Sequence, residues 1–226
     1  MIVVNNVRVQ FGGRVLFDEV NLKFQKGNCY GIIGANGAGK STFLKVLCGE
    51  LEPSSGSVTI DSGERMSILA QNQNAFDDLT VLDTVLGGHK RLMEIKNELD
   101  SLYIKPDITD EDGMHMADLQ FEFGEIGGWE AESEAQSLLS EIGVDSSLLY
   151  TLMRDVEPKV KVKVLLARAL FMNPDILVLD EPTNNLDVKT VNWLENFLLN
   201  FENMVIVVSH NRYFLNRICT HICDVD

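Results

Sequence analysis

The feature that most constrains this chain is an apolar segment, residues 29–33, which runs directly into the glycine-rich turn of residues 34–42. The segment has the length and composition of a buried strand. The turn fits the pattern of two glycines, separated by four residues, before Lys and Ser. Glycines allow backbone N–H groups to face an anion without a side chain in the way. The pattern predicts that Lys40 reaches the β- and γ-phosphates of a nucleotide and that Ser41 offers its hydroxyl to Mg²⁺.

A helix is expected to begin at this turn, with Phe43, Leu44 and Leu47 as its apolar positions, and to point its positive N-terminus at the anion. The alternative is a plain strand–turn–helix corner rich in small residues. Such a corner has no need for Gly, Lys and Ser in this register. The predicted nucleotide-binding residues of the loop are Gly34, Ala35, Asn36, Gly37, Ala38, Gly39, Lys40, Ser41 and Thr42.

Composition narrows the class of protein. Hydrophobic residues make up 45% of the 226 residues, which is ordinary for a globular core and predicts one large domain or a domain with an insertion. The first residues lack the pattern of a signal peptide, and no apolar run approaches the roughly 20 residues that span a bilayer. We therefore expect a cytoplasmic protein; if it serves a transporter, another chain supplies the membrane part.

Charge and cysteine content exclude further classes. The formal net charge is −15, and the segment from Glu94 to Glu141 holds fourteen acidic residues against two lysines. Such a surface argues against broad contact with phosphate backbones and is typical of a solvated helical face. The four cysteines do not form a disulfide pattern, and Cys29 and Cys48 are predicted to be small core residues. The cluster Cys219–Cys223 could bind a metal but lacks a second pair of ligands.

Hydrophobic periodicity predicts an α/β protein. Residues 1–24 alternate as β structure around a turn at Gly12-Gly13, and the pattern becomes helical from Thr80. Further strands are predicted at residues 57–60, 65–70, 174–181 and 204–210, and helices at about 80–102, 110–123, 129–142 and 162–170. Helices before, between and after the late strands predict a largely parallel sheet, in which ligand chemistry collects at the carboxyl ends of strands.

Polar side chains stand at several of these strand ends. Asp180 is expected to coordinate Mg²⁺, and Glu181 is placed to orient or deprotonate an attacking water. His210 could contact the γ-phosphate, and Gln71 could reach the metal or the water. Alone, each has an ordinary explanation as an exposed acid, a strand-end histidine or a polar loop residue. Their order in the chain after Lys40 argues against coincidence.

That order resembles the ATP-binding cassette (ABC) ATPases, and the resemblance extends over essentially the whole chain. It implies that the chain binds ATP with Mg²⁺, that Phe11 stacks on adenine, and that Gln71 is the Q-loop residue. It also implies that Asp180 and Glu181 are the Walker B acid and the catalytic glutamate, and that His210 is the switch histidine. The implied catalytic residues are Glu181, His210 and Gln71, and the implied metal ligands are Ser41, Gln71 and Asp180.

Within that superfamily, the motif of residues 180–187, Asp-Glu-Pro-Thr-Asn-Asn-Leu-Asp, resembles the ABC-F group of translation-associated ATPases. Residues 123–130 resemble the short arm of that group. The resemblance implies a mostly parallel phosphate-loop core with an N-terminal antiparallel β part and a helical insertion. It places a single ABC domain over residues 1–226, with the nucleotide-binding core at about 1–71 and 159–226 and the helical subdomain with its arm at about 72–158.

The implied partners are a second cassette, in the same chain or another, and the ribosome with its rRNA and tRNA. Because the group carries two cassettes and this chain ends where the first would end, we expect a first cassette. One departure stands out: the family signature Leu-Ser-Gly-Gly-Gln/Glu falls on residues 156–160, Val-Glu-Pro-Lys-Val, which contain neither Ser nor Gly. Glu157 would place a negative charge near the γ-phosphate that the partner cassette holds. Slow hydrolysis by the chain alone is therefore expected.

Two other classes of function remain open. The chain could be the nucleotide-binding subunit of an ABC transporter, against which the arm-like insertion, Asn184-Asn185 and the altered signature all count. It could also be a module that holds ATP without hydrolysing it. The presence of Asp180, Glu181 and His210 argues against that second alternative.

Overall fold

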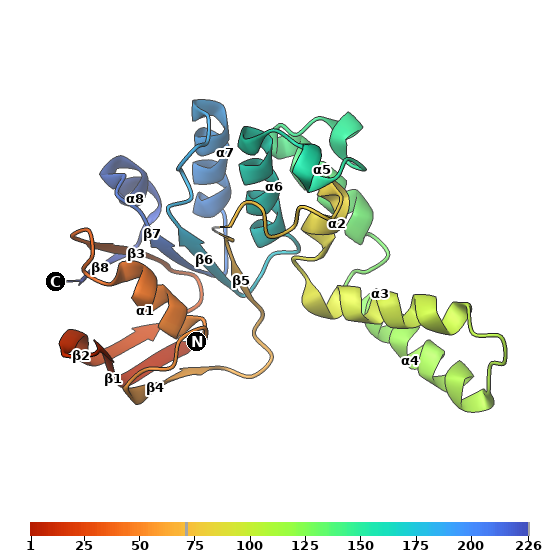
Figure 1. Cartoon of the computed structure of the whole chain (residues 1–226), viewed down its shortest axis with the longest axis horizontal. Coiled ribbons are helices and arrows are strands. Elements are labelled where there is room, and N and C mark those ends of the chain that lie inside the picture. Colours follow the sequence, from red (N-terminus) through yellow and green to blue (C-terminus); the bar gives the residue numbers. More distant parts are fainter. Residues whose placement is uncertain (71, 226) are drawn as a thin grey trace. The chain divides into compact units, whose positions relative to one another are not determined.

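The computed structural model describes residues 1–70 and 72–225 and divides into two compact units (Figure 1). The first unit comprises the described residues up to 70 and those from Asn173 onward, and the second comprises Asn72–Met172. Each unit is considered by itself below. The second part of the nucleotide-binding core was expected to begin at about residue 159. In the structure, α6 (Pro158–Leu170) belongs to the second unit, because it packs against α2 (Val81–Leu86) and α5 (Ala131–Ile142).

The first unit contains an antiparallel sheet of three strands in the order β2-β1-β4. Its strands are β1 (Ile2–Phe11), β2 (Arg14–Phe24) and β4 (Ser55–Ile60). The predicted turn at Gly12-Gly13 joins β1 to β2 as a two-residue hairpin loop. In β1 the apolar residues of one face are buried, because successive side chains point to opposite faces of the sheet. The predicted N-terminal antiparallel part is thereby confirmed.

The second sheet of this unit has five strands in the order β5-β6-β7-β3-β8, and every pair is parallel. Its strands are β3 (Cys29–Gly34), β5 (Met66–Ile68), β6 (Ile176–Asp180), β7 (Met204–Val208) and β8 (His221–Val225). The helices of the unit are α1 (Lys40–Leu47), α7 (Val188–Leu199) and α8 (Arg212–Ile218). The strands β6, β7 and β3 are almost entirely buried, as expected of a parallel sheet that is covered on both faces. The predicted α/β class with a mostly parallel sheet is confirmed.

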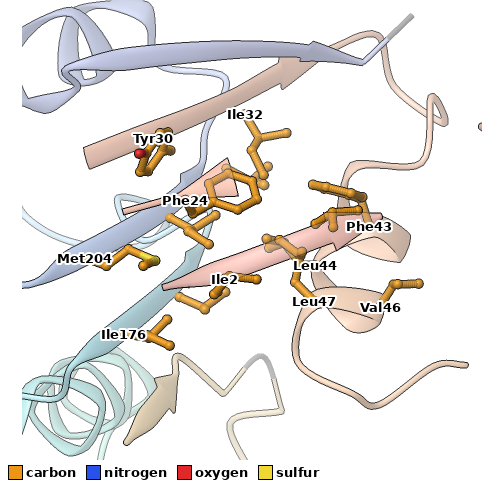
Figure 2. Packing of buried hydrophobic residues seen from close by; sticks show 14 of the residues in the cluster. Ile2, Phe24, Tyr30, Ile32, Phe43, Leu44, Val46, Leu47, Ile176 and Met204 are labelled. Atoms are coloured by element: carbon orange, nitrogen blue, oxygen red, sulfur yellow. The ribbon is translucent and has the colours of Figure 1, made fainter. Parts of the chain in front are cut away.

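One hydrophobic core joins the two sheets to helix α1 (Figure 2). Side chains from β1 and β2 meet those of β3, β6 and β7, and α1 contributes its apolar face to the same core. The residues labelled in Figure 2 are Ile2, Phe24, Tyr30, Ile32, Phe43, Leu44, Val46, Leu47, Ile176 and Met204. Each fully buried side chain of this size contributes about 1.5–3 kcal/mol to folding. The core therefore holds rigid the strand end from which the glycine-rich loop departs.

The second unit is helical, as predicted. It contains α2, α3 (Lys90–Tyr103), α4 (Asp110–Glu125), α5 and α6, with two short 3₁₀ turns at Ser146–Leu148 and Met153–Asp155. Helices α3 and α4 lie side by side as a hairpin, and Arg91 of α3 pairs with Glu122 of α4. Thr109 and Asp112 form a capping box that begins α4. Helix α4 extends slightly beyond its predicted end at residue 123, and Gly124 lies inside its last turn.

Candidate functional site

The glycine-rich loop wraps around the ammonium group of Lys40. The loop residues Gly34, Gly37 and Gly39 have φ values of +148°, +81° and +110°, a region in which residues with a Cβ are strained. Lys40 is the first residue of α1, and its Nζ donates to the carbonyl oxygens of Gly34 and Ala35 at 2.9 Å each. The Lys40 side chain is buried, although it carries a charge. A buried ammonium group that faces a ring of backbone atoms fits the recognition of phosphate oxygens.

An open pocket of about 340 Å³ lies over this loop. Its lining residues come from the loop, from the strand ends of β6 and β7, and from β2. They are Leu16, Asn36, Gly37, Gly39, Lys40, Ser41, Thr42, Asp180, Glu181, Asn184, Val208 and His210. Six of the nine predicted loop residues thus meet both predicted acids and the predicted histidine in one pocket. Of the other three, Gly34 and Ala35 accept from Lys40, and the Ala38 N–H donates to the Ala35 carbonyl.

Glu181 lies directly after β6 and adopts a left-handed backbone conformation with φ of +49°. Its N–H donates to the carbonyl oxygen of Val208 at 2.8 Å, which ties it to the end of β7. One carboxylate oxygen, Oε2, accepts from the backbone N–H of His210 at 3.3 Å. The other, Oε1, is a buried atom without a hydrogen bond from the described residues. His210 Nε2 lies 3.5 Å from Oε1, an ion-pair distance when the imidazole is protonated.

The conformation of Glu181 has two energetic costs, and the first comes from its unbonded Oε1. A buried carboxylate oxygen without a hydrogen-bond donor is costly, on the order of 1–3 kcal/mol, and among the described residues Oε2 of Glu195, away from the pocket, is a second such atom. A left-handed backbone at a non-glycine residue adds a further cost, on the order of 1 kcal/mol. Glu181 thus lines the pocket with one carboxylate oxygen bonded to the His210 backbone and the other facing the His210 ring.

Ser41 and Asp180 fit a Mg²⁺ ion bound together with phosphate. Both residues line the pocket over the loop, and both also line a second pocket of about 140 Å³ between α1 and the ends of β5 and β6. Their oxygen atoms are the hard ligands that Mg²⁺ prefers, and phosphate oxygens and water complete its shell. Within residues 1–70 and 72–225 there is no group of three or more His, Cys, Asp or Glu side chains placed to hold a metal.

Two other predicted site residues are Phe11 and Gln71. Phe11 is at the end of β1 and is 54% exposed, but it is absent from the pocket lining. Gln71 lies outside the described residues. The structure adds three pocket residues that were not predicted as site residues, namely Leu16 of β2, Asn184, and Val208 at the end of β7. Asn184 belongs to a motif that the analysis did quote, whereas nothing in the sequence separates Leu16 from other strand residues.

The segment in place of the family signature lies in the second unit. Val156 is buried, and Glu157 is exposed immediately before Pro158, the first residue of α6. The Glu157 side chain makes no capping hydrogen bond to the helix. The helix start thus presents a carboxylate where the family motif supplies a serine hydroxyl and glycine N–H groups.

Known proteins resemble this chain over its whole length. The family model described as ABC transporter matches residues 17–184. YkpA of Bacillus subtilis, an uncharacterized ABC transporter ATP-binding protein, is 58% identical over 100% of this chain and 42% of its own length. YbiT of Escherichia coli, a probable ATP-binding protein, is 50% identical over 100% of this chain and 43% of its own length. The energy-dependent translational throttle protein EttA of Mycobacterium tuberculosis is 31% identical over 99% of this chain and 40% of its own length.

Solved structures show the same fold. A dimeric ATP-binding cassette in a post-hydrolysis state, bound to ADP and Pi, superposes with a TM-score of 0.71 at 21% identity, covering 100% of this chain and 94% of that one. The fold and the pocket define an α/β phosphate-loop protein. The chain belongs to the ABC transporter family of ATP-binding cassettes, and its relatives include ABC-F-type proteins.

Two further findings bear on function. The chain spans less than half the length of the curated relatives YkpA and YbiT. In the part of the chain that the structure describes, none of the helices combines the length and apolarity needed to cross a membrane.

Proposed function

We propose that this chain binds and hydrolyses ATP as the first cassette of a two-cassette, ABC-F-type protein that acts on translation at the ribosome. The observation that carries hydrolysis is the free Oε1 of Glu181, beside His210 in the pocket over the Lys40 loop. Support for the translational role comes from the 31% identity to EttA and from Asn184-Asn185 in the motif that follows Glu181.

Each residue would have a separate task in hydrolysis. Lys40, which now donates to two loop carbonyls, would donate to the β- and γ-phosphates. Ser41 and Asp180 would hold Mg²⁺, which neutralises the developing negative charge on the phosphates. Glu181 would accept the proton of the attacking water through Oε1, and the His210 N–H would keep the carboxylate in place through Oε2. The roles of Phe11 at the adenine and of Gln71 at the water or metal remain part of the proposal.

A second cassette would complete the reaction. The loop of this chain would be closed by the signature of the partner, and the Val156–Val160 segment would face the partner's phosphate loop. Because that segment supplies Glu157 and no signature serine, the two composite sites would differ in activity. The isolated chain, pairing only with itself, would hydrolyse ATP slowly. A turnover of the isolated chain close to that of the two-cassette protein would contradict this part of the proposal.

The alternative is the nucleotide-binding subunit of an ABC transporter. The observation in its favour is the name of YkpA, which describes an ABC transporter ATP-binding protein. Under this alternative the output of ATP binding would be solute movement by a separate membrane protein.

A catalytically trapped variant distinguishes the two functions. Glu181→Gln, combined with the matching change in the second cassette of the full-length protein, should bind ATP and stay closed, because the amide fits the site but cannot act as base. This variant should co-sediment with ribosomes in the presence of Mg·ATP and not in the presence of Mg·ADP. Lys40→Ala in the same background is the control, and it should abolish the effect of ATP. Co-purification with a membrane permease, without ribosome binding, would favour the transporter alternative.

A further inference from the structure

Cys29 and Cys219 form a pair of thiols at the end of the parallel sheet opposite to the nucleotide pocket. Cys29 is the first residue of β3, and Cys219 directly follows α8. Their Sγ atoms lie 3.6 Å apart, although 190 positions separate the two residues in the chain. A disulfide bond measures about 2.05 Å, so modest side-chain rotations of the two residues would close the gap.

The backbone around the pair is already joined. Thr220 donates its N–H to the carbonyl oxygen of Cys29 at 2.8 Å, and the Cys29 N–H donates to Oγ1 of Thr220 at 3.1 Å. Gly31 makes room for the second sulfur, because a Cβ at this position would lie 2.9 Å from Sγ of Cys219. The backbone hydrogen bonds therefore hold the two cysteines at their separation, and the absence of a side chain at Gly31 leaves room for Cys219 Sγ together with Ile222.

The two thiols differ in character. The Cys29 thiol donates a hydrogen bond to Sγ of Cys219, which lowers the pKa of Cys219 against the opposing effect of burial. That hydrogen bond and burial together raise the pKa of Cys29. Cys219 is also partly exposed, whereas Cys29 is buried. Cys219, the more exposed residue of the two, is thus also the better nucleophile, and buried Cys29 lies beside it, as in a pair with a peroxidatic and a resolving thiol.

We propose that Cys29 and Cys219 are a redox modification site that closes to a reversible disulfide when the protein meets a hydroperoxide. In the first step the Cys219 thiolate attacks one oxygen of H₂O₂, the O–O bond breaks, and hydroxide leaves, which gives a sulfenic acid on Cys219. In the second step the sulfur of Cys29 attacks the sulfur of that sulfenic acid. The S–O bond breaks, and the departing hydroxide takes the Cys29 proton and leaves as water. A dithiol reductant reverses the reaction by thiol–disulfide exchange.

The disulfide would clip the amino end of β3 to the end of α8. Cys29 and Gly34 are the first and last residues of β3, so the new bond lies roughly 17 Å from the loop, at about 3.3 Å per residue. We therefore expect the disulfide to stabilise the nucleotide-binding unit and to leave ATP affinity within about twofold of its reduced value. Closure of a loop of this length should raise the Tm by about 5–15 °C.

Peptide mapping of the purified protein tests this proposal. After brief exposure to H₂O₂ and alkylation of the remaining thiols, mass spectrometry should find a Cys29–Cys219 cross-link that is absent after dithiothreitol treatment. The same treatment in urea should give no preference for this pair. A Cys219–Cys223 cross-link, a chain-to-chain cross-link as the main product, or Cys219 sulfinic acid in its place would overturn the proposal.

Substitutions separate the pair from the other cysteines. Cys223→Ser is the matched control, because Cys223 is also half-buried and its raised pKa reflects burial first and then the nearby Cys219. This variant should keep both the cross-link and the reversible rise in Tm, whereas Cys29→Ser should lose both. An unchanged response to H₂O₂ in Cys29→Ser would also refute the proposal. These outcomes do not depend on ATP hydrolysis, so they stand apart from the test of the proposed function.

Discussion

The strained backbone of Glu181 allows its structural cost and its catalytic role to be separated with two variants. Glu181→Gln keeps the length of the side chain and removes the base. Glu181→Asn also removes the base, but Asn adopts the left-handed region with φ near +49° more readily and is one methylene shorter. Both variants should therefore lose hydrolysis, and only the second should gain stability.

The size of each effect follows from the geometry. Loss of the general base costs a factor of about 10²–10⁴ in rate, which is about 2.7–5.4 kcal/mol in the barrier. In Glu181→Asn, relief of the backbone strain raises the free energy of unfolding by about 1 kcal/mol. The shorter side chain no longer buries an unbonded Oε1, which adds about 1 kcal/mol. The 3.3 Å hydrogen bond from the His210 N–H is lost, at a cost of about 0.5 kcal/mol. The net gain is about 1–2 kcal/mol, or about 2–8 °C in Tm for a chain of this size.

The assay compares single-turnover ATP hydrolysis in the two-cassette protein with thermal unfolding of the same variants without nucleotide. Glu195→Gln is the control, because Glu195 is a buried acid of the same unit that pairs with Arg217 at 3.2 Å and lies away from the pocket. It should lower the Tm without changing the rate at the Glu181 site. Equal Tm values for Glu181→Asn and Glu181→Gln would refute the argument from strain. Hydrolysis by either variant near the wild-type rate would refute the assignment of the base.

Three further predictions concern ligand binding, packing and pH. Mg·ATP at about 100 times its Kd should raise the Tm by about 5–10 °C, since bound ligand adds about 2.7 kcal/mol, and Lys40→Ala should abolish most of this rise in differential scanning fluorimetry. Gly56→Ala should lower the free energy of unfolding by about 2–4 kcal/mol, because its Cβ would lie 2.2 Å from the carbonyl oxygen of Asn6 at a φ of +83°. Gly63→Ala, with a similar φ of +87° and nothing within 4 Å, should cost only about 1 kcal/mol in urea unfolding. The ion pair with Lys105 and the hydrogen bonds from Thr109 lower the pKa of Asp112 to about 2 from 3.8, so its contribution to stability is present above about pH 4 and is lost as the pH falls through about 2. An NMR titration should give this pKa and should show it rise in Lys105→Met; a value near 3.8 in the wild type would contradict the interpretation.

Local sequence patterns determined much of the fold. The turn from β3 into α1 could be predicted because glycine, lysine and serine at fixed spacing act on backbone conformations within a few residues of each other. Most strands and helices could be predicted from periodicity, because side chains repeat on one face every 2.0 residues in a strand and every 3.6 in a helix, whereas β8 was not predicted. The order of the predicted site residues along the chain sufficed to predict the family, because that order can be read from the sequence without knowing how far apart the residues lie in space.

Only the tertiary structure determined which residues from distant parts of the chain are neighbours in space. The pairing of β6 with β7 brings Glu181 at the end of β6 to His210 after β7, and the strand order β5-β6-β7-β3-β8, which is not the chain order, places β3 and its loop next to β7. The left-handed backbone of Glu181 and its unbonded Oε1 appear only when the loop after β6 is tied to Val208. The sequence analysis predicted Cys29 to be a small core residue, and its contact with Cys219 depends on α8 ending beside the first residue of β3. Such contacts join residues far apart in the chain through packing and strand register, and no pattern within a short window of a single sequence specifies them.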